Sequence, residues 1–379
     1  MINENIKPAI LVEDLTQLPQ MVSELSRFPK IGVDTESNSL FEYDEKICLI
    51  QFSTETTDYL LDTVKLRELE PLRNLFNSEK IEKIFHAAEY DLMCLKRDFS
   101  FEFNNIFDTM IASRILGFNS IGLSSLIKNF FDITIDKKFQ RANWGKRPIS
   151  EEMRLYAQLD THFLIDLRNI LYSKLVENNK LELAKEDFQR ITDVDAFVNN
   201  KNHENYWRII KGNSLTQQQE SVLIELYYLR ENLAKQSNRP PFKVFSNQAI
   251  INIAKKLPKD LNQLKSIDHF TPKLIQKYGE KVITAINEGL SKNNCSKKDK
   301  FKPNPSYLRK YEVLKQWRKQ KGNELSVESD IILPKEHLEQ LAHLKQCDLQ
   351  NIQTIMYNIP YRFNKFGEEI LSLLERNGE

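Results

Sequence analysis

The chain has 379 residues, of which 41% are hydrophobic and 28% are charged, and its formal net charge is +1. This length exceeds what one ordinary hydrophobic core can organise, so we expect two or three globular domains. No apolar run reaches the roughly 18 residues that a transmembrane helix needs, and the balanced charge does not by itself indicate polyanion binding.

The first residues and the cysteines both favour a cytoplasmic protein. Residues 1–8 lack the basic and apolar segments of a secretory signal. Cys48, Cys94, Cys295 and Cys347 are far apart and form no CxxC pair, so we expect reduced thiols and neither a zinc site nor a disulfide framework. We predict no membrane association and no obligate protein partner.

The chain up to about residue 205 alternates between strand-like and helix-like stretches. Strands are predicted at residues 31–34, 47–53, 57–61 and 81–86. Helices are predicted at residues 66–77, 90–98, 109–116, 123–131 and 151–175. A block of strands followed by strand–helix alternation indicates an α/β domain with a mixed sheet flanked by helices.

From about residue 212 the pattern is helical, and the segment resembles itself. Tyr-Gly-Glu at 278–280 recurs as Phe-Gly-Glu at 366–368, and the two glycines, at 279 and 367, are 88 residues apart. The same shift aligns further apolar positions, among them Ile250 with Leu338. We therefore predict two copies of one small helical domain. The expected domains are 1–205, 212–292 and 306–379, and residues 291–305, rich in Lys and Asn, are the expected linker.

The stretch 31–37, Ile-Gly-Val-Asp-Thr-Glu-Ser, places two carboxylates one residue apart on an apolar strand. Residues i and i+2 of a strand point to the same side, so Asp34 and Glu36 would face one site. Carboxylates this close repel each other, and a proton or a cation relieves the repulsion. Taken alone, the pair favours a solvated acidic strand end, and the alternative is a hard cation bound by oxygen ligands.

Three downstream residues extend this hypothesis. Asp91 follows the strand at 81–86 and is either a third ligand or a first-turn acid favoured by the helix N-terminus. Tyr156 and Asp160, four residues apart, share one helical face, where they could also be simple surface neighbours. Two magnesium or manganese ions need several carboxylates and can activate water at one ion while stabilising the leaving oxygen at the other.

These motifs, in this order, resemble the tyrosine-bearing branch of the DEDD exonuclease superfamily, and the whole chain is similar to the ribonuclease D family. The first shared motif is Asp-Thr-Glu at 34–36, followed by Cys-Leu-Ile-Gln at 48–51. The second is His-Ala-Ala-Glu-Tyr-Asp at 86–91, followed by Phe-Asp-Thr at 107–109. The third is Tyr-Ala-Gln-Leu-Asp at 156–160, preceded by Trp144 and by Arg-Pro at 147–148. The helical copies resemble the helicase-and-RNase-D C-terminal (HRDC) domain. The second copy is less typical, because Asp-Ile-Ile-Leu-Pro at 330–334 replaces the Pro-Pro-Phe of the first copy at 240–242.

The resemblance implies a ribonuclease H-like α/β exonuclease domain followed by two small all-α domains that hold RNA. It also implies hydrolysis of RNA from the 3′ end with two divalent ions, Mg²⁺ or Mn²⁺, and release of nucleoside 5′-monophosphates. Transfer RNA precursors are the implied substrates. By the same resemblance, Asp34, Glu36 and Asp160 hold the catalytic ion, Asp34 also reaches the second ion, Asp91 supports that ion through water, and Tyr156 aligns the nucleophilic water.

The basic loop at 136–148 is a candidate contact for nucleic acid. Lys138, Arg141 and Arg147, with the ring of Trp144, could hold the 3′ strand through phosphate contacts and stacking. The alternative is a solvated loop with a buried tryptophan.

Two other functions remain open at this stage. One is a non-catalytic nucleic-acid-binding protein on an exonuclease fold. The other is an exonuclease that acts on DNA, because recognition of the 2′-hydroxyl depends on pocket geometry. His86 is either near the site or a structural hydrogen-bond partner, and Asp108 is either a helix cap or a supporting residue.

Overall fold

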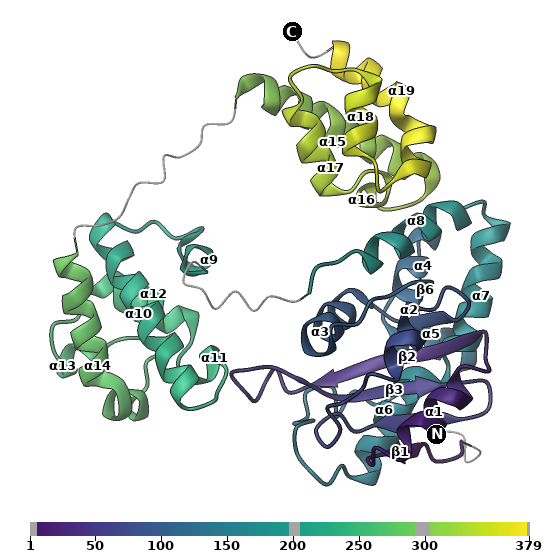
Figure 1. Ribbon diagram of the computed structural model, residues 1–379. Helices are drawn as coiled ribbons and strands as arrows, with labels where there is room; N and C mark the ends of the chain where they lie inside the picture. Colours follow the sequence, from purple (N-terminus) through teal and green to yellow (C-terminus); the bar gives the residue numbers. More distant parts are fainter. Residues whose placement is uncertain (1–5, 197–204, 293–303, 377–379) are drawn as a thin grey trace. The chain divides into compact units, whose positions relative to one another are not determined.

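The computed structural model describes residues 6–196, 205–292 and 304–376 (Figure 1). The chain forms two compact units, one made of 1–37, 47–197 and 302–379, the other of 38–46 and 198–301. Within the described ranges, no helix has both the length and the apolar character needed to cross a bilayer. Cys48 and Cys94 are buried, and Cys347 is half-buried. Cys295 and most of the expected linker lie outside the described residues.

A six-stranded mixed sheet forms the centre of the α/β domain, in the order β1-β4-β3-β2-β5-β6. Its strands are β1 (Ile10–Val12), β2 (Lys30–Ser37), β3 (Ile47–Ser53), β4 (Asp58–Leu61), β5 (Glu82–Phe85) and β6 (Ile106–Asp108). Strand β3 runs antiparallel to β2 and β4, and the other pairs are parallel. The mixed sheet was predicted, but β1 and β6 were missed because strands of three residues carry too little alternation.

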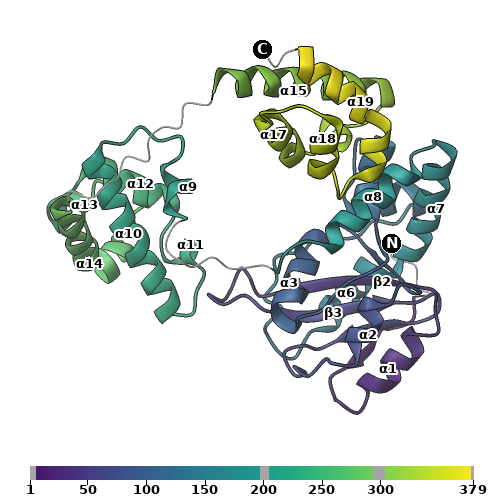
Figure 2. The ribbon, with the colours of Figure 1, turned by 45° about the horizontal axis from the view of Figure 1, so that its top comes forward.

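Helices cover both faces of this sheet (Figures 1 and 2). They are α1 (Leu18–Leu25), α2 (Leu72–Asn77), α3 (Glu89–Phe99), α4 (Thr109–Leu116), α5 (Leu123–Phe131), α6 (Glu151–His162), α7 (Leu164–Glu177) and α8 (Leu181–Thr192). The helix predicted at 151–175 is in fact two helices that meet at Phe163. Neither proline nor glycine marks this break, so the sequence pattern could not reveal it.

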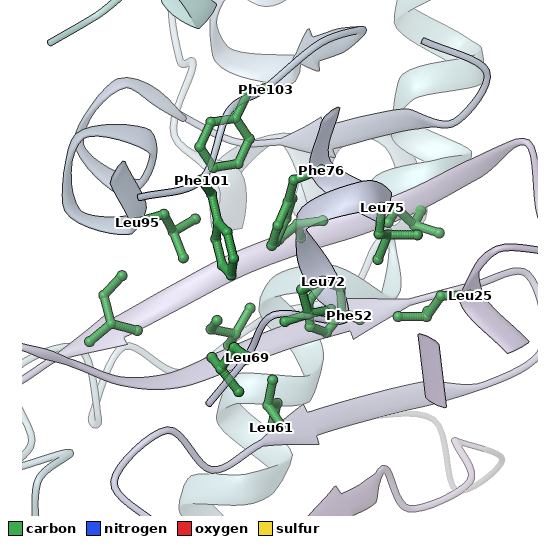
Figure 3. Packing of buried hydrophobic residues seen from close by; sticks show 14 of the residues in the cluster. Leu25, Phe52, Leu61, Leu69, Leu72, Leu75, Phe76, Leu95, Phe101 and Phe103 are labelled. Carbon is green, nitrogen blue, oxygen red and sulfur yellow. The ribbon is translucent and has the colours of Figure 1, made fainter. Parts of the chain in front are cut away.

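The largest hydrophobic core lies on the face covered by α1, α2 and α3. Figure 3 shows Phe76 of α2 beside Phe101 and Phe103, and its ring centroid lies 5.1 Å from each of theirs. Burying one such side chain stabilises the fold by about 1.5–3 kcal/mol. This core holds β2 and β3 rigidly from one side and leaves their opposite face to α6.

The helical repeat predicted from the sequence is confirmed in the helix boundaries. The first copy contains α10 (Gln217–Gln236), α11 (Pro241–Val244), α12 (Asn247–Lys256), α13 (Leu261–Leu264) and α14 (Pro272–Ser291), preceded by α9 (Tyr206–Ile210). The second contains α15 (Pro305–Leu325), α16 (Ser329–Ile332), α17 (Lys335–His343), α18 (Leu349–Ile355) and α19 (Pro360–Arg376). Each helix of the second copy begins 88 residues after its counterpart (217 to 305, 241 to 329, 247 to 335, 261 to 349, 272 to 360).

Within the first unit, the second helical copy packs on the α/β domain through a buried ion pair. Arg362 of α19 is 0% exposed, and its guanidinium donates to Glu186 and, at 2.8 Å, to Asp187, both on α8. The backbone N–H of Tyr361 donates to the same Glu186 carboxylate at 2.6 Å. Ile331 of α16 joins a hydrophobic cluster whose other buried members belong to the α/β domain, and Val327 and Tyr361 pack against it as well. We keep the domain boundaries given above as a proposal. This contact shows that the second copy packs directly against the α/β domain.

Candidate active site

Strand β2 and helix α6 bring three carboxylates together. Oxygen atoms of Asp34, Glu36 and Asp160 all lie within 4.8 Å of one another. Gly32 permits this approach, because a Cβ at that position would lie 2.9 Å from the carbonyl oxygen of Thr161, the residue after Asp160. The absence of a side chain on β2 therefore lets α6 approach the strand and carry its acid to the pair predicted from the sequence.

Asp91 reaches the same place from the first turn of α3. Its carboxylate accepts a hydrogen bond from the hydroxyl of Thr35, the residue between Asp34 and Glu36. It lies outside the three-carboxylate cluster and is tied to the motif through this hydroxyl. The structure thus brings all four predicted acids to one end of β2.

The four carboxylates share an environment that disfavours negative charge. Burial, followed by the charges of Asp160 and Asp91, raises the pKa of Glu36 to about 9. Burial is also the main reason why the pKa values of Asp91 and Asp160 rise to about 7 and that of Asp34 lies well above its ordinary value. Such a cluster is stabilised by a bound cation, which replaces the protons that the acids would otherwise retain.

The donor set fits a hard divalent cation such as Mg²⁺ or Mn²⁺. All the ligand atoms are carboxylate oxygens, which these ions prefer over nitrogen and sulfur. His86, the histidine of the second motif, has a structural role instead. Burial lowers its pKa to about 4, and its Nδ1 lies 2.9 Å from the hydroxyl of Thr109, as in the structural alternative.

Tyr156 lies one helical turn before Asp160 on α6. Its ring centroid lies 6.1 Å from that of Trp144 and 6.1 Å from that of Phe139. Burial, and then the charges of Asp160 and Glu36, hold the pKa of its phenol well above the ordinary value. The phenol is thus held in its protonated form, in which it can donate a hydrogen bond to a water molecule or a phosphate oxygen.

A buried polar network that no local sequence pattern indicates ties α6 to strands β3 and β4. The side-chain amide of Gln158 donates to Asp58 of β4 at 2.6 Å, and Nδ1 of His162 lies 2.8 Å from the same carboxylate oxygen. The hydroxyl of Ser53 on β3 donates to that of Thr161 at 2.7 Å. These partners are about a hundred residues apart in the chain, so no local pattern could indicate them.

Asp108 caps α4 and also fixes the turn that leads to Asp91. Its carboxylate accepts hydrogen bonds from the amides of Met110 at 2.8 Å and Ile111 at 3.0 Å, which confirms the predicted cap. It also accepts from the amide of Ala88 at 2.7 Å, just after Ala87, whose φ of 64° is left-handed. One carboxylate thus caps α4 and holds the turn that precedes α3.

The four residues predicted to contact nucleic acid divide into two pairs. Trp144 is 1% exposed, and Arg147 holds the buried Asp62 through bonds of 2.5 and 2.6 Å while also donating to Cys48 O. These two residues support Tyr156 and strands β3 and β4, as in the buried-tryptophan alternative. Lys138 and Arg141 are exposed. A contact between these two residues and nucleic acid remains a prediction.

The α6 arrangement yields a testable consequence at Gly32. In Gly32→Ala the added methyl group would force α6 and β2 apart, and overpacking of this kind costs about 1–3 kcal/mol. Asp160 would move with α6, and a displacement near 1 Å costs turnover on the order of 10²-fold. Urea unfolding and initial exonuclease rates would measure the two effects. Gly122→Ala is the matched control, since its Cβ would meet nothing within 4 Å. Unchanged turnover in Gly32→Ala would show that the close approach is dispensable.

Two family models match this chain. A 3′–5′ exonuclease domain model matches residues 9–176, which contain all four acids and Tyr156. The HRDC domain model matches twice, at residues 219–286 and 308–374. The exonuclease domain thus coincides with the α/β domain, and the HRDC domains coincide with the two helical copies.

Relatives of two kinds align with the chain. The exosome complex exonuclease RRP6 of Saccharomyces cerevisiae is 31% identical over 312 residues, which are 78% of this chain but only 42% of the yeast protein. Ribonuclease D of Bartonella henselae is 26% identical over 373 residues, 96% of this chain and 90% of that protein. The chain spans less than half the length of the RRP6-type relatives and nearly all of the ribonuclease D relatives.

Solved structures agree with the fold. The catalytic core of RRP6 from Trypanosoma brucei superposes with a TM-score of 0.65 at 27% identity, covering 76% of this chain and 81% of that one. Escherichia coli RNase D gives a TM-score of 0.68 at 19% identity over 98% of this chain and 100% of that one, a likeness of fold. The chain therefore contains one 3′–5′ exonuclease domain followed by two HRDC domains, and it is similar to ribonuclease D over almost its full length.

Proposed function

We propose that this protein shortens RNA from the 3′ end with two bound divalent cations and releases nucleoside 5′-monophosphates. The observation that carries the proposal is the convergence of Asp34, Glu36 and Asp160 within 4.8 Å, with Tyr156 one turn away. Such ions lower the pKa of water and stabilise charge on the leaving oxygen.

The residues of the site have distinct tasks in this proposal. Asp34, Glu36 and Asp160 would hold one ion, and Asp34 together with Asp91 would serve the other. The protonated phenol of Tyr156 donates a hydrogen bond that orients the attacking water against the terminal phosphodiester. All five side chains are half-buried, and this partial removal from water strengthens their electrostatic effect.

RNA, and not DNA, is the proposed substrate because ribonuclease D proteins align over nearly the full chain. Within that class we propose precursor transfer RNAs, on the strength of the family resemblance, and a cytoplasmic location without an obligate protein partner. A non-catalytic nucleic-acid-binding role is disfavoured because all four acids and the tyrosine are in place.

The test uses a short single-stranded RNA with a 5′ label, the purified protein, and either Mn²⁺ or EDTA. A metal-dependent ladder that shortens by one nucleotide at a time from the 3′ end is the expected result. A DNA oligonucleotide of the same sequence separates RNA from DNA activity, and a transfer RNA transcript with a 3′ extension tests the proposed substrate. Binding of the RNA without shortening would favour the non-catalytic alternative.

Tyr156→Phe separates the tyrosine from the metal ligands. It removes one hydroxyl and keeps the ring packed against Trp144 and Phe139, so Mn²⁺ affinity should stay the same while turnover falls on the order of 10²-fold. Single-turnover rates and Mn²⁺ titration give the two values. Tyr172→Phe on α7 is the matched control and should match the wild type. An unchanged rate in Tyr156→Phe would reduce the tyrosine to a packing role.

A further inference from the structure

Gln51 is a buried amide without a hydrogen-bond partner among the described residues. It is 0% exposed, and neither its side-chain nitrogen nor its side-chain oxygen is paired with another described group. Leaving such a group unsatisfied in a protein interior is costly, and in native structures it usually has a reason, such as an ion or a functional partner. The location of Gln51 indicates which reason applies.

Strand register places Gln51 directly opposite Asp34. The two residues are partners in the antiparallel β2–β3 pair, so their side chains leave the sheet on the same face and start from neighbouring positions. That face is the one covered by α6, because Ser53, two residues further on β3, bonds to Thr161 of that helix. Gln51 therefore lies beneath the acidic cluster, between the sheet and α6.

On β4, the residue directly opposite Gln51 is the apolar Leu60, and the buried, unpaired Oδ1 of Asp58 lies opposite Ser53, thus only diagonally from Gln51. The neighbours on β2 and β3 offer no other acceptor. Leu49, which lies opposite Glu36, is apolar, and Gly32, which lies opposite Ser53, has no side chain. The hydroxyl of Ser53 is already bonded to Thr161 at 2.7 Å. Asp34 is thus the acceptor that the register brings nearest to this amide.

We propose that Gln51 is a positioning residue of the metal site, whose amide nitrogen donates to the Asp34 carboxylate in the cation-loaded protein and fixes its orientation. This inference rests on the proposed two-metal function and deepens it. An ionised carboxylate is an acceptor only, and its hydrogen bond to a neutral donor is stronger than one between two neutral groups. Groups that orient metal ligands in this way typically contribute 10- to 100-fold in metal affinity, on the order of that range here.

Gln51→Met tests the proposal because methionine keeps the length of the side chain and removes both polar atoms. The metal-free variant should melt at the same temperature as the wild type or higher, since an unsatisfied buried amide has been removed. Its dissociation constant for Mn²⁺, measured from the paramagnetic resonance signal of the free ion, should rise about 10- to 100-fold. Gln51→Leu should give the same two results.

Ser113→Ala is the matched control, on α4, a helix that carries none of the proposed ligands. It removes a buried hydroxyl that already donates to the backbone oxygen of Thr109 at 2.7 Å, so it should lower the melting temperature and leave the Mn²⁺ affinity unchanged. Wild-type Mn²⁺ affinity in both Gln51 variants would overturn the proposal. Parallel losses of melting temperature and affinity in both variants would also overturn it, because the amide would then serve the fold. If the wild-type protein itself binds no Mn²⁺, the proposed two-metal function is wrong. This result differs from a failure of the Gln51 proposal alone, in which the wild type binds Mn²⁺ and the Gln51 variants bind it equally well.

Discussion

Asp34→Asn is expected to reduce 3′ shortening of RNA on the order of 10³-fold or more, since it removes charge at the centre of the transition-state stabilisation. Asp34 lies on β2 with its carboxylate oxygen within 4.8 Å of those of Glu36 and Asp160, and it is the residue proposed to reach both ions. Asparagine has the same size, so the effect should fall on metal binding and turnover and not on the fold.

The stability of this variant should change in an informative direction. Burial, and then the charges of Asp91, Asp160 and Glu36, hold the pKa of Asp34 well above its ordinary value. A carboxyl group whose pKa is raised by folding destabilises the fold as the pH rises above its unfolded-state pKa, near 3.9. In EDTA at neutral pH, Asp34→Asn should therefore melt at the same temperature as the wild type or higher.

Initial rates on the 5′-labelled RNA and melting curves in EDTA measure both effects. Asp132→Asn is the matched control, because its carboxylate is 92% exposed and belongs to a surface pair with Lys128. It should match the wild type in both measurements. A folded Asp34→Asn protein that shortens RNA at the wild-type rate would overturn the metal assignment.

The residues of the site could be predicted from the sequence to the extent that they follow a local period. The two-residue period of a strand pairs Asp34 with Glu36, and the four-residue spacing on a helix pairs Tyr156 with Asp160. What brings the pairs together is not local. It depends on Gly32, because the absence of a Cβ there lets α6 pack closely against β2. The contact is with Thr161, which lies 129 positions later in the chain (32 to 161).

Long side chains with two possible roles could not be assigned from the sequence alone. Arg147 can hold either a phosphate or a carboxylate with the same guanidinium, and only the fold shows that Asp62, 85 residues earlier, is its partner. The same limit applies to Trp144, which suits either a base or a hydrophobic core. The repeat was predictable because both copies keep their apolar positions in one register.

The divergence between the two copies has a structural explanation that the sequence did not reveal. Glu328 and Asp330 both bind Arg114 of α4, and Asp330 occupies the position of Phe242 in the first copy. Arg362 likewise stands where the first copy has Leu274, which is 88 residues earlier. The residues that make the second copy untypical are therefore the residues that attach it to the exonuclease domain.

Arg362→Leu is accordingly expected to destabilise the first unit by about 3–5 kcal/mol, because it leaves the buried Glu186 without a cation and leaves Asp187 only its bond to Arg190. The substitution places in the second copy the residue type, leucine, that the first copy has at the corresponding position, Leu274. Urea unfolding of the full chain measures the effect as a loss in the transition that includes the exonuclease domain. Leu274→Met, a substitution of similar volume at the matching position of the first copy, is the control and should cost less than about 1.5 kcal/mol.

The ion pair between Arg362 and Glu186 also determines the expected effect of removing the second HRDC domain. If the second HRDC domain served only to hold RNA, removal of residues 302–379 would weaken binding of structured RNA and spare cleavage of a short oligonucleotide. Truncation also uncovers the hydrophobic cluster that contains Ile331 and leaves Glu186 of α8 without its cation, so we expect short-oligonucleotide cleavage to fall as well, through lost stability. Full stability and cleavage in both the truncated protein and Arg362→Leu would show that the buried pair contributes nothing to the exonuclease domain. The expected result is a loss of stability and cleavage in both proteins. If the triple variant Arg362→Leu, Glu186→Gln and Asp187→Asn regains part of the stability that Arg362→Leu loses, the effect comes from the carboxylate charges that Arg362 no longer neutralises.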